Sequence, residues 1–193
     1  SAHDQQPEKK RGLLLRIFDG ICRFYLTVVR GTPMMVQLLI MWFVIWPALF
    51  PGSVRATDGN LIRCAVLAFG INSGAYVAEI VRSGIMSIDK GQMEAARSLG
   101  LSYGKAMRKV ILPQAFRTML PSIINQFIIS LKDTSLVSVI GPRELTQNGK
   151  IIAANSASMV MPIWICVALF YLVVCTILSR IAKYVERRVS YGK

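Results

Sequence analysis

The chain has 193 residues and a formal net charge of +13, yet only 17% of its residues are charged and 53% are hydrophobic, with a mean hydropathy of +0.48. A disordered chain would be poorer in apolar residues, and a soluble nucleic-acid-binding domain would carry more Lys and Arg on a more polar surface. The composition argues against both classes and predicts a helical membrane protein with cationic loops.

The first predicted element, residues 13–29, is apolar but is interrupted by three charged residues. Charged side chains are costly at the centre of a bilayer. We therefore expect an interfacial helix that leads into the first membrane span and is either continuous with it or bent near Gly31 and Pro33.

Four stretches are apolar and long enough to cross the hydrocarbon core of a membrane, which is ~30 Å thick and needs roughly 20 helical residues. They comprise residues 32–50, 61–82, 119–140 and 159–179. Pro33 suits the first turn of the first span, where a missing backbone N–H costs nothing. The fourth span is almost uniformly apolar, so we expect lipid to cover much of its surface.

Lys and Arg residues gather on one side of these spans. They precede the first span, occupy the connection between the second and third, and follow the fourth, whereas the other two connections carry few of them. Cytoplasmic loops of membrane proteins are enriched in Lys and Arg. We therefore expect the long middle connection and the C-terminus to be cytoplasmic, and the net charge is chiefly a signal of topology.

The second span carries one stripe of small and polar residues. At alternating steps of three and four, which is the spacing of one helix face, come Ala65, Ala68, Asn72, Ala75, Glu79 and Arg82. Two interpretations stay open for this face. It is either a tightly packed helix interface, or Asn72 and Glu79 also face a polar pathway.

The third span is more polar. Asn125 and Asp133 share about one third of the helix circumference, and Lys132 lies at its edge. Adjacent residues do not face each other on a helix, so Lys132 and Asp133 need partners on other elements. Ionisable groups inside a membrane segment are candidates for function, and a structural ion pair between helix ends is the competing interpretation.

The connection between the second and third spans, residues 84–116, has the pattern of ordered helices. Asp89 can cap a short amphipathic helix that Gly100 ends, and Ser102 can cap a second one that stops ahead of Pro113. Two short helices that project from a membrane domain suit a groove on a cytoplasmic partner. From the residues alone, a simple re-entrant elbow is an equally good interpretation.

Residues Glu94, Ala95, Ala96 and Gly100, followed after nine residues by VILP at 110–113, resemble the EAA loop of ABC transporter permeases. Further similar segments are RGTPMMVQ at 30–37, NSGAYVAEIVRSGI at 72–85, GQMEAARSLGLS at 91–102, VILPQAFR at 110–117 and LKDTSLVSVIG at 131–141. The chain is similar to the polar amino acid uptake branch of that family, which contains histidine, glutamine, glutamate and arginine importers.

The resemblance implies an all-α polytopic membrane protein with the fold of a type I ABC importer transmembrane domain and a cytoplasmic coupling helix. In such systems the EAA loop seats in a cleft of the ATPase, a role that would fall to Glu94, Ala95, Ala96 and Gly100. It also implies a multi-pass location in the inner or plasma membrane of a prokaryote. Members of the branch typically have five spans, so we expect one span, with or without fused binding domains, to precede this chain.

The implied partners are ABC ATPase subunits, a second identical or similar permease, and an extracytoplasmic substrate-binding protein or fused domain. No segment matches G-x-x-x-x-G-K-[ST], so we expect no catalytic residue, metal or cofactor in this chain and assign ATP and Mg to the ATPase. The chain itself is then not an enzyme, although it is part of an ATP-hydrolysing complex.

Our hypothesis is a permease subunit that moves a polar amino acid inward. A zwitterion needs paired donors and acceptors when it leaves water, and the candidate groups are Asn72, Glu79, Asn125, Lys132, Asp133, Thr134 and Ser135. The alternative is an ATP-independent membrane channel or a scaffold protein. Co-purification with an ATPase, or conductance without ATP, would distinguish the two.

Overall fold

The computed structural model describes residues 13–53 and 56–190, the last three of these by their backbone alone. The regular structure of this part of the chain is entirely helical, which confirms the all-α prediction. The helices, in chain order, are α1 (Leu13–Gly31), α2 (Met34–Ile40), α3 (Trp46–Leu49), α4 (Asp58–Met86), α5 (Lys90–Ser98), α6 (Tyr103–Ala106), α7 (Leu112–Asp133), α8 (Leu145–Asn155) and α9 (Val160–Ser190). Shorter 3-10 turns follow α3, α7 and α8.

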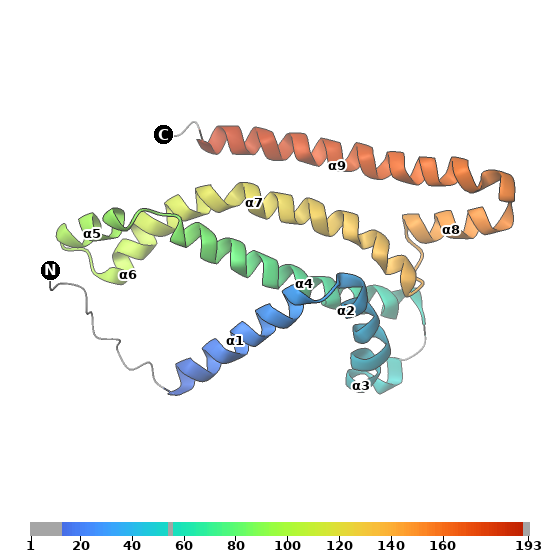
Figure 1. Cartoon of the computed structure of the whole chain (residues 1–193), viewed down its shortest axis with the longest axis horizontal. Helices are drawn as coiled ribbons and strands as arrows, with labels where there is room; N and C mark the ends of the chain where they lie inside the picture. Colours follow the sequence, from blue (N-terminus) through green and yellow to red (C-terminus); the bar gives the residue numbers. More distant parts are fainter. Residues whose placement is uncertain (1–12, 54–55, 191–193) are drawn as a thin grey trace.

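Three long helices, α4, α7 and α9, run along the molecule beside one another, with α7 between the other two (Figure 1). The short helices α5 and α6 lie at one end of this bundle, and α3 and α8 lie at the opposite end. Gly84 lets α4 and α7 approach closely, since a Cβ atom there would lie 3.0 Å from Cβ of Met119. Ala115 and Met119 of α7 are buried at this contact.

Two helices of the described residues are long and apolar enough to cross a membrane, Asp58–Met86 and Ala157–Arg187. The pair Leu13–Gly31 and Met34–Leu49 meets the same criteria only when taken together, and it is bent by 111°. A further span was predicted at 119–140, but its helix α7 begins at Leu112, ends at Asp133 and does not meet the criteria. The polar and charged side chains along α7 explain the difference, and a 3-10 turn continues from Thr134 to Val139.

The bend between α1 and α2 is held by one side chain, Gln37. Its amide nitrogen donates to the backbone carbonyl oxygens of Val29, at 2.6 Å, and Thr32, at 3.0 Å. Its amide oxygen accepts a hydrogen bond of 2.9 Å from Asn72 of α4. A sharp bend frees carbonyls that have no water to bind inside a membrane, so Gln37 supplies the partner that the helix has lost.

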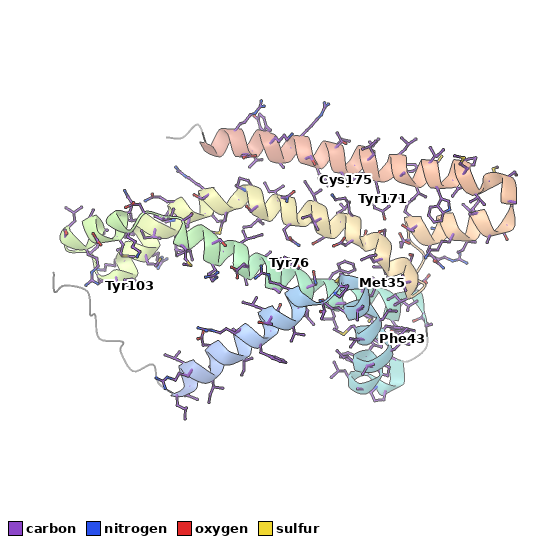
Figure 2. The ribbon with its side chains drawn as sticks, in the orientation of Figure 1. Met35, Phe43, Tyr76, Tyr103, Tyr171 and Cys175 are labelled. Atoms are coloured by element: carbon purple, nitrogen blue, oxygen red, sulfur yellow. The ribbon has the colours of Figure 1, made fainter. Side chains whose placement is uncertain are left out.

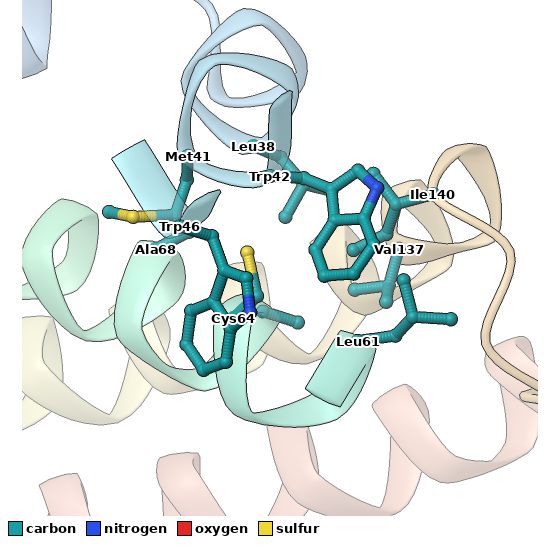
Figure 3. Packing of buried hydrophobic residues seen from close by; sticks show 10 residues of the cluster. Leu38, Met41, Trp42, Trp46, Leu61, Cys64, Ala68, Val137 and Ile140 are labelled. Carbon is teal, nitrogen blue, oxygen red and sulfur yellow. The ribbon is translucent and has the colours of Figure 1, made fainter. Parts of the chain in front are cut away.

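Figure 3 shows the hydrophobic core. It lies where α2, the π-helical turn Met41–Ile45 and α3 cross the start of α4 and the turn after α7. Trp46 packs there beside Cys64 and Ala68, whose small side chains leave room for the indole rings of the first span. Trp46 Nε1 also donates to the carbonyl oxygen of Ser53 at 3.2 Å. The core therefore anchors the end of the bundle opposite α5.

The sequence predicted that the second short helix would stop ahead of Pro113, and this is wrong. Helix α6 continues through a π-helical turn, Met107–Ile111, directly into α7. Pro113 is the second residue of α7, which directly follows the π turn, and such a turn is a local irregularity of the kind that accompanies a proline within a continuous helix. The continuous helical backbone joins α6 directly to α7.

Candidate functional site

Helix α5 is a short element with a defined cap at each end. The carboxylate of Asp89 accepts a hydrogen bond of 2.6 Å from the backbone N–H of Gly91. At the other end Gly100 has φ +81°, and the N–H groups of Gly100 and Leu101 donate to the carbonyl oxygens of Arg97 and Ala96. This is a Schellman motif, which requires the left-handed conformation that glycine adopts readily.

The four predicted coupling residues lie together on α5 and its C-terminal turn, but their surroundings differ. Ala96 is buried, whereas Glu94, Ala95 and Gly100 are exposed. The side chain of Leu99 is 84% exposed. Among residues 13–53 and 56–187, no ion pair includes Glu94. This surface therefore presents a carboxylate, small residues and an apolar side chain that the chain itself leaves uncovered.

The same segment connects the two helices that pack most extensively on each other. Helix α5 follows α4 after a short turn and leads through α6 into α7, so that it closes one end of both (Figure 1). Gln114 of α7 donates a long hydrogen bond of 3.4 Å to Gln92 of α5. A displacement of α5 would thus act on α4 and α7 together.

A first cleft, of about 360 Å³, lies where the end of α1 meets α4 and α7. Glu79 is its central charge, at 3.3 Å from a guanidinium nitrogen of Arg30 on α1 and 2.6 Å from one of Arg82 on α4. Figure 2 shows Tyr76 on α4 beside the end of α1, and the Arg30 guanidinium lies 5.9 Å from the centre of its ring. Ser122 and other hydroxyl-bearing residues line the remaining wall.

A second cleft, of about 530 Å³, lies between α7 and α9, with Ile80 of α4 as part of its wall. It holds the predicted residue Asn125 together with groups from both helices. Its lining consists of Ile80, Pro121, Ser122, Asn125, Gln126, Ile128, Ser179, Ala182, Lys183 and Glu186. Ile80, Ser122 and Gln126 also line the first cleft, so the two clefts adjoin across the α4 and α7 helices.

The other predicted pathway residues lie elsewhere. Asn72 is buried in the hydrogen-bonded bend at Gln37. Lys132 and Asp133 are at the far end of α7 and Thr134 and Ser135 in the turn after it, and none of these four lines either cleft. The structure therefore spreads the seven candidates along the length of the bundle instead of collecting them in one pocket.

Sequence reasoning missed Arg30, Tyr76, Lys183 and Glu186 as cleft residues. Arg30 and Lys183 were counted only as cations beside a span. The positions 179, 182, 183 and 186 share one helix face, and this spacing could have indicated that Lys183 and Glu186 turn toward the same neighbour. No sequence signal joins that face to Asn125.

Comparisons with known proteins agree on the family. Residues 13–191 match the family described as binding-protein-dependent transport system inner membrane component. The glutamine transport system permease protein of Escherichia coli K12 is 44% identical over 90% of this chain and 77% of the relative. The arginine transport system permease protein of Bacillus subtilis 168 is 40% identical over 91% and 77%, and the L-cystine permease protein of that strain is 40% identical over 86% and 68%.

Two solved structures share the fold. A crystal structure of an amino acid ABC transporter with histidines has a TM-score of 0.81 and 39% sequence identity, over 90% of this chain and 78% of that one. An inward-facing methionine ABC transporter has a TM-score of 0.63 at 18% identity, over 90% and 76%. The second likeness concerns the fold alone.

Proposed function

Since this chain belongs to the binding-protein-dependent transport system inner membrane components and is a permease subunit of an amino acid ABC importer, we propose that it carries a polar amino acid inward when a separate ATPase moves α5. The relatives named for glutamine, arginine and cystine support a polar substrate. They do not favour the alternative of an ATP-independent channel or scaffold.

The position of α5 carries this proposal. Its exposed face, with Glu94, Ala95 and the Gly100 turn, is free to enter a cleft of the ATPase, while Ala96 is buried and the helix itself packs on α6 and the π turn after it. Because α5 closes the ends of α4 and α7, closure of the ATPase would tilt both helices. Rigid-body tilting of this kind is the general basis of alternating access.

The ABC importer family implies ATPase and substrate-binding partners. In our proposal ATP and Mg bind to the ATPase and not to this chain, and an extracytoplasmic binding protein or fused domain delivers the substrate. A second permease subunit, identical or similar, completes the pathway. The chain is an inner membrane component, and we place α5 and the C-terminus on the cytoplasmic side, in line with the enrichment of Lys and Arg there.

The proposed pathway follows the polar residues of α4 and α7. Lys132, Asp133, Thr134 and Ser135 stand at the end opposite α5, Asn72 lies between the ends, and Glu79 and Asn125 line the two clefts. A substrate moving inward would meet these groups in succession. Their order along the bundle supports a pathway with several successive polar contacts for the substrate.

The test is reconstitution of the chain with its ATPase and binding protein in vesicles. We expect ATP-dependent uptake of at least one of L-glutamine, L-arginine, L-cystine and L-histidine, together with stimulated ATP hydrolysis. Uptake or conductance without ATP would favour the channel. If alanine replacements at the seven candidates left uptake and substrate affinity unchanged, the pathway assignment would be wrong.

A further inference from the structure

The two clefts differ in whether their charged side chains already form ion pairs. In the first cleft the Glu79 carboxylate is paired with both Arg30 and Arg82. In the second, Lys183 and Glu186 are both exposed, and no ion pair among residues 13–53 and 56–187 includes either of them. The ammonium group of a ligand would have to share the Glu79 carboxylate with two arginines in the first cleft, whereas the second cleft offers a carboxylate and an ammonium group that form no ion pair within the described residues.

The second cleft also carries neutral polar groups opposite these charges. Asn125 and Gln126 contribute amides from α7, and Ser122 and Ser179 contribute hydroxyl groups from the two sides. Ile80, Pro121 and Ile128 form apolar parts of the wall. A cleft that combines a cation, an anion, amides and apolar surface matches the chemistry of a small zwitterion with a polar side chain.

We propose that the cleft between α7 and α9 binds the transported amino acid, with Lys183 holding its carboxylate and Glu186 its ammonium group. Asn125 and Gln126 then bind the polar side chain. The proposal rests on the proposed function and adds to it a site at the α5 end of the pathway, with Lys183, which the sequence assigned only to topology, and Glu186, to which it assigned no role. A site close to the α5 end suits the last substrate-binding position before release into the cytoplasm.

The local geometry is compatible with this assignment. Residues three apart on a helix lie on the same side, one turn from each other, so Lys183 and Glu186 can contact the two charged ends of one amino acid. Both side chains are exposed, so a ligand in the cleft can reach each of them. Hydrogen bonds between ionised groups are the strong ones, so each residue should matter clearly for binding.

The experiment measures equilibrium binding of a radiolabelled amino acid to the permease and ATPase complex in nanodiscs, without the binding protein. The probe is whichever of L-glutamine, L-arginine, L-cystine and L-histidine is taken up by the unsubstituted complex. We expect Lys183→Gln and Glu186→Gln each to raise the Kd about tenfold. The matched control is Arg187→Gln, a neighbouring cation outside the cleft, which should leave the Kd unchanged.

Ligand analogues separate binding from a structural effect. In the unsubstituted complex, the carboxamide of the same amino acid should displace the radiolabelled ligand poorly, because it lacks the carboxylate that Lys183 binds. In Lys183→Gln, the carboxamide and the parent amino acid should bind with similar Kd values. The N-acetyl analogue, which lacks the ammonium group, should likewise bind poorly to the unsubstituted complex and about as well as the parent amino acid to Glu186→Gln. A variant that was merely misfolded would lose both analogues and the parent ligand alike.

Three outcomes would overturn the proposal. The first is an unchanged Kd in both variants, and the second is an equal loss in Arg187→Gln. The third is a loss that occurs only in bilayers with phosphatidylglycerol and not in pure phosphatidylcholine, which would assign the two charges to a lipid headgroup. If the unsubstituted complex takes up none of the four amino acids, the proposed function itself fails, and the cleft loses its ligand for that separate reason.

Discussion

The side-chain amide of Asn72 donates a hydrogen bond of 2.9 Å to the amide oxygen of Gln37, and this contact joins α4 to the bend between α1 and α2. Gln37 is in turn bound to the two backbone carbonyls that the bend leaves free. The pair therefore couples the direction of α1, which differs by 111° from that of the next segment, to the central helix of the bundle.

Replacing Gln37 by Leu should destabilise the protein by about 1–3 kcal/mol, since two carbonyls and the buried Asn72 amide lose their partner. Asn72→Leu should cost less, because Gln37 keeps its bonds to Val29 and Thr32. The measurement is equilibrium unfolding in mixed micelles. Equal effects of the two substitutions, or none, would contradict the role of Gln37 as the centre of this network.

Reversing the charge of Glu94 should uncouple ATP hydrolysis from transport. Glu94→Lys removes an exposed carboxylate that we assign to the ATPase contact, without touching the buried side of α5. We expect insertion into the membrane and thermal stability to be preserved, while substrate-stimulated ATPase activity and uptake fall at least tenfold. Normal transport by this variant would remove Glu94 from the coupling surface.

Gly100 should tolerate no side chain for a reason of backbone conformation alone. No atom lies within 4 Å of a Cβ built there, but its φ of +81° is unfavourable for other residues. Gly100→Val should therefore disorder the end of α5 and reduce coupling. Gly104→Val is the control, because that glycine also has open space around its Cβ position but no positive φ.

The two glycine variants are compared by substrate-stimulated ATPase activity and by protease sensitivity of the segment that follows α5. Gly100→Val should raise cleavage and lower stimulation, and Gly104→Val should stay much closer to the unsubstituted chain. An equal loss of ATPase stimulation in both variants would mean that the segment after α5 does not tolerate a larger side chain, and not that Gly100 is needed for its left-handed conformation.

The part of the site that depends on local signals could be predicted from the sequence. Asp89 and Gly100 mark the two ends of α5 in the sequence, because helix capping and a left-handed turn depend only on neighbouring residues. The continuity of α6 with α7 could not be read in this way, because a π turn ahead of Pro113 leaves no residue pattern that distinguishes it from a stop.

Contacts between helices that are distant along the chain could not be predicted from the sequence for a different reason. Periodicity shows that Asn72 and Glu79 share a face, but not that Gln37 and Arg30 lie opposite them. The charge of Lys183 had a sufficient explanation in membrane topology, so its place in a cleft became visible only when α9 was packed beside α7. Tertiary packing determines which polar residues meet.

Gly84 should be sensitive to the smallest side chain. A Cβ atom there would lie 3.0 Å from Cβ of Met119 and 3.5 Å from the carbonyl oxygen of Ala115, and both atoms belong to the body of α7, so they cannot swing away. Gly84→Ala should therefore destabilise the chain by about 1–3 kcal/mol through overpacking. Gly70→Ala on the same helix, with no atom within 4 Å, is the control and should be neutral or slightly stabilising in the same unfolding assay.

The ion pairs of Glu79 predict an asymmetry between its partners. Arg30→Gln removes one cation, but Glu79 keeps Arg82 at 2.6 Å, so stability should change little. Glu79→Gln leaves Arg30 and Arg82 close together without the carboxylate that they share. Their mutual repulsion should lower the melting temperature more than Arg30→Gln does. Among residues 13–53 and 56–187, the further contact of Arg30 is with the ring of Tyr76. Arg30 joins α1 to α4, so protease cleavage within α1 should rise in both variants. If Arg30→Gln proved the more damaging substitution for stability, Glu79 would not be the centre of this cluster, and the contact of Arg30 with Tyr76 would have to hold α1 in place.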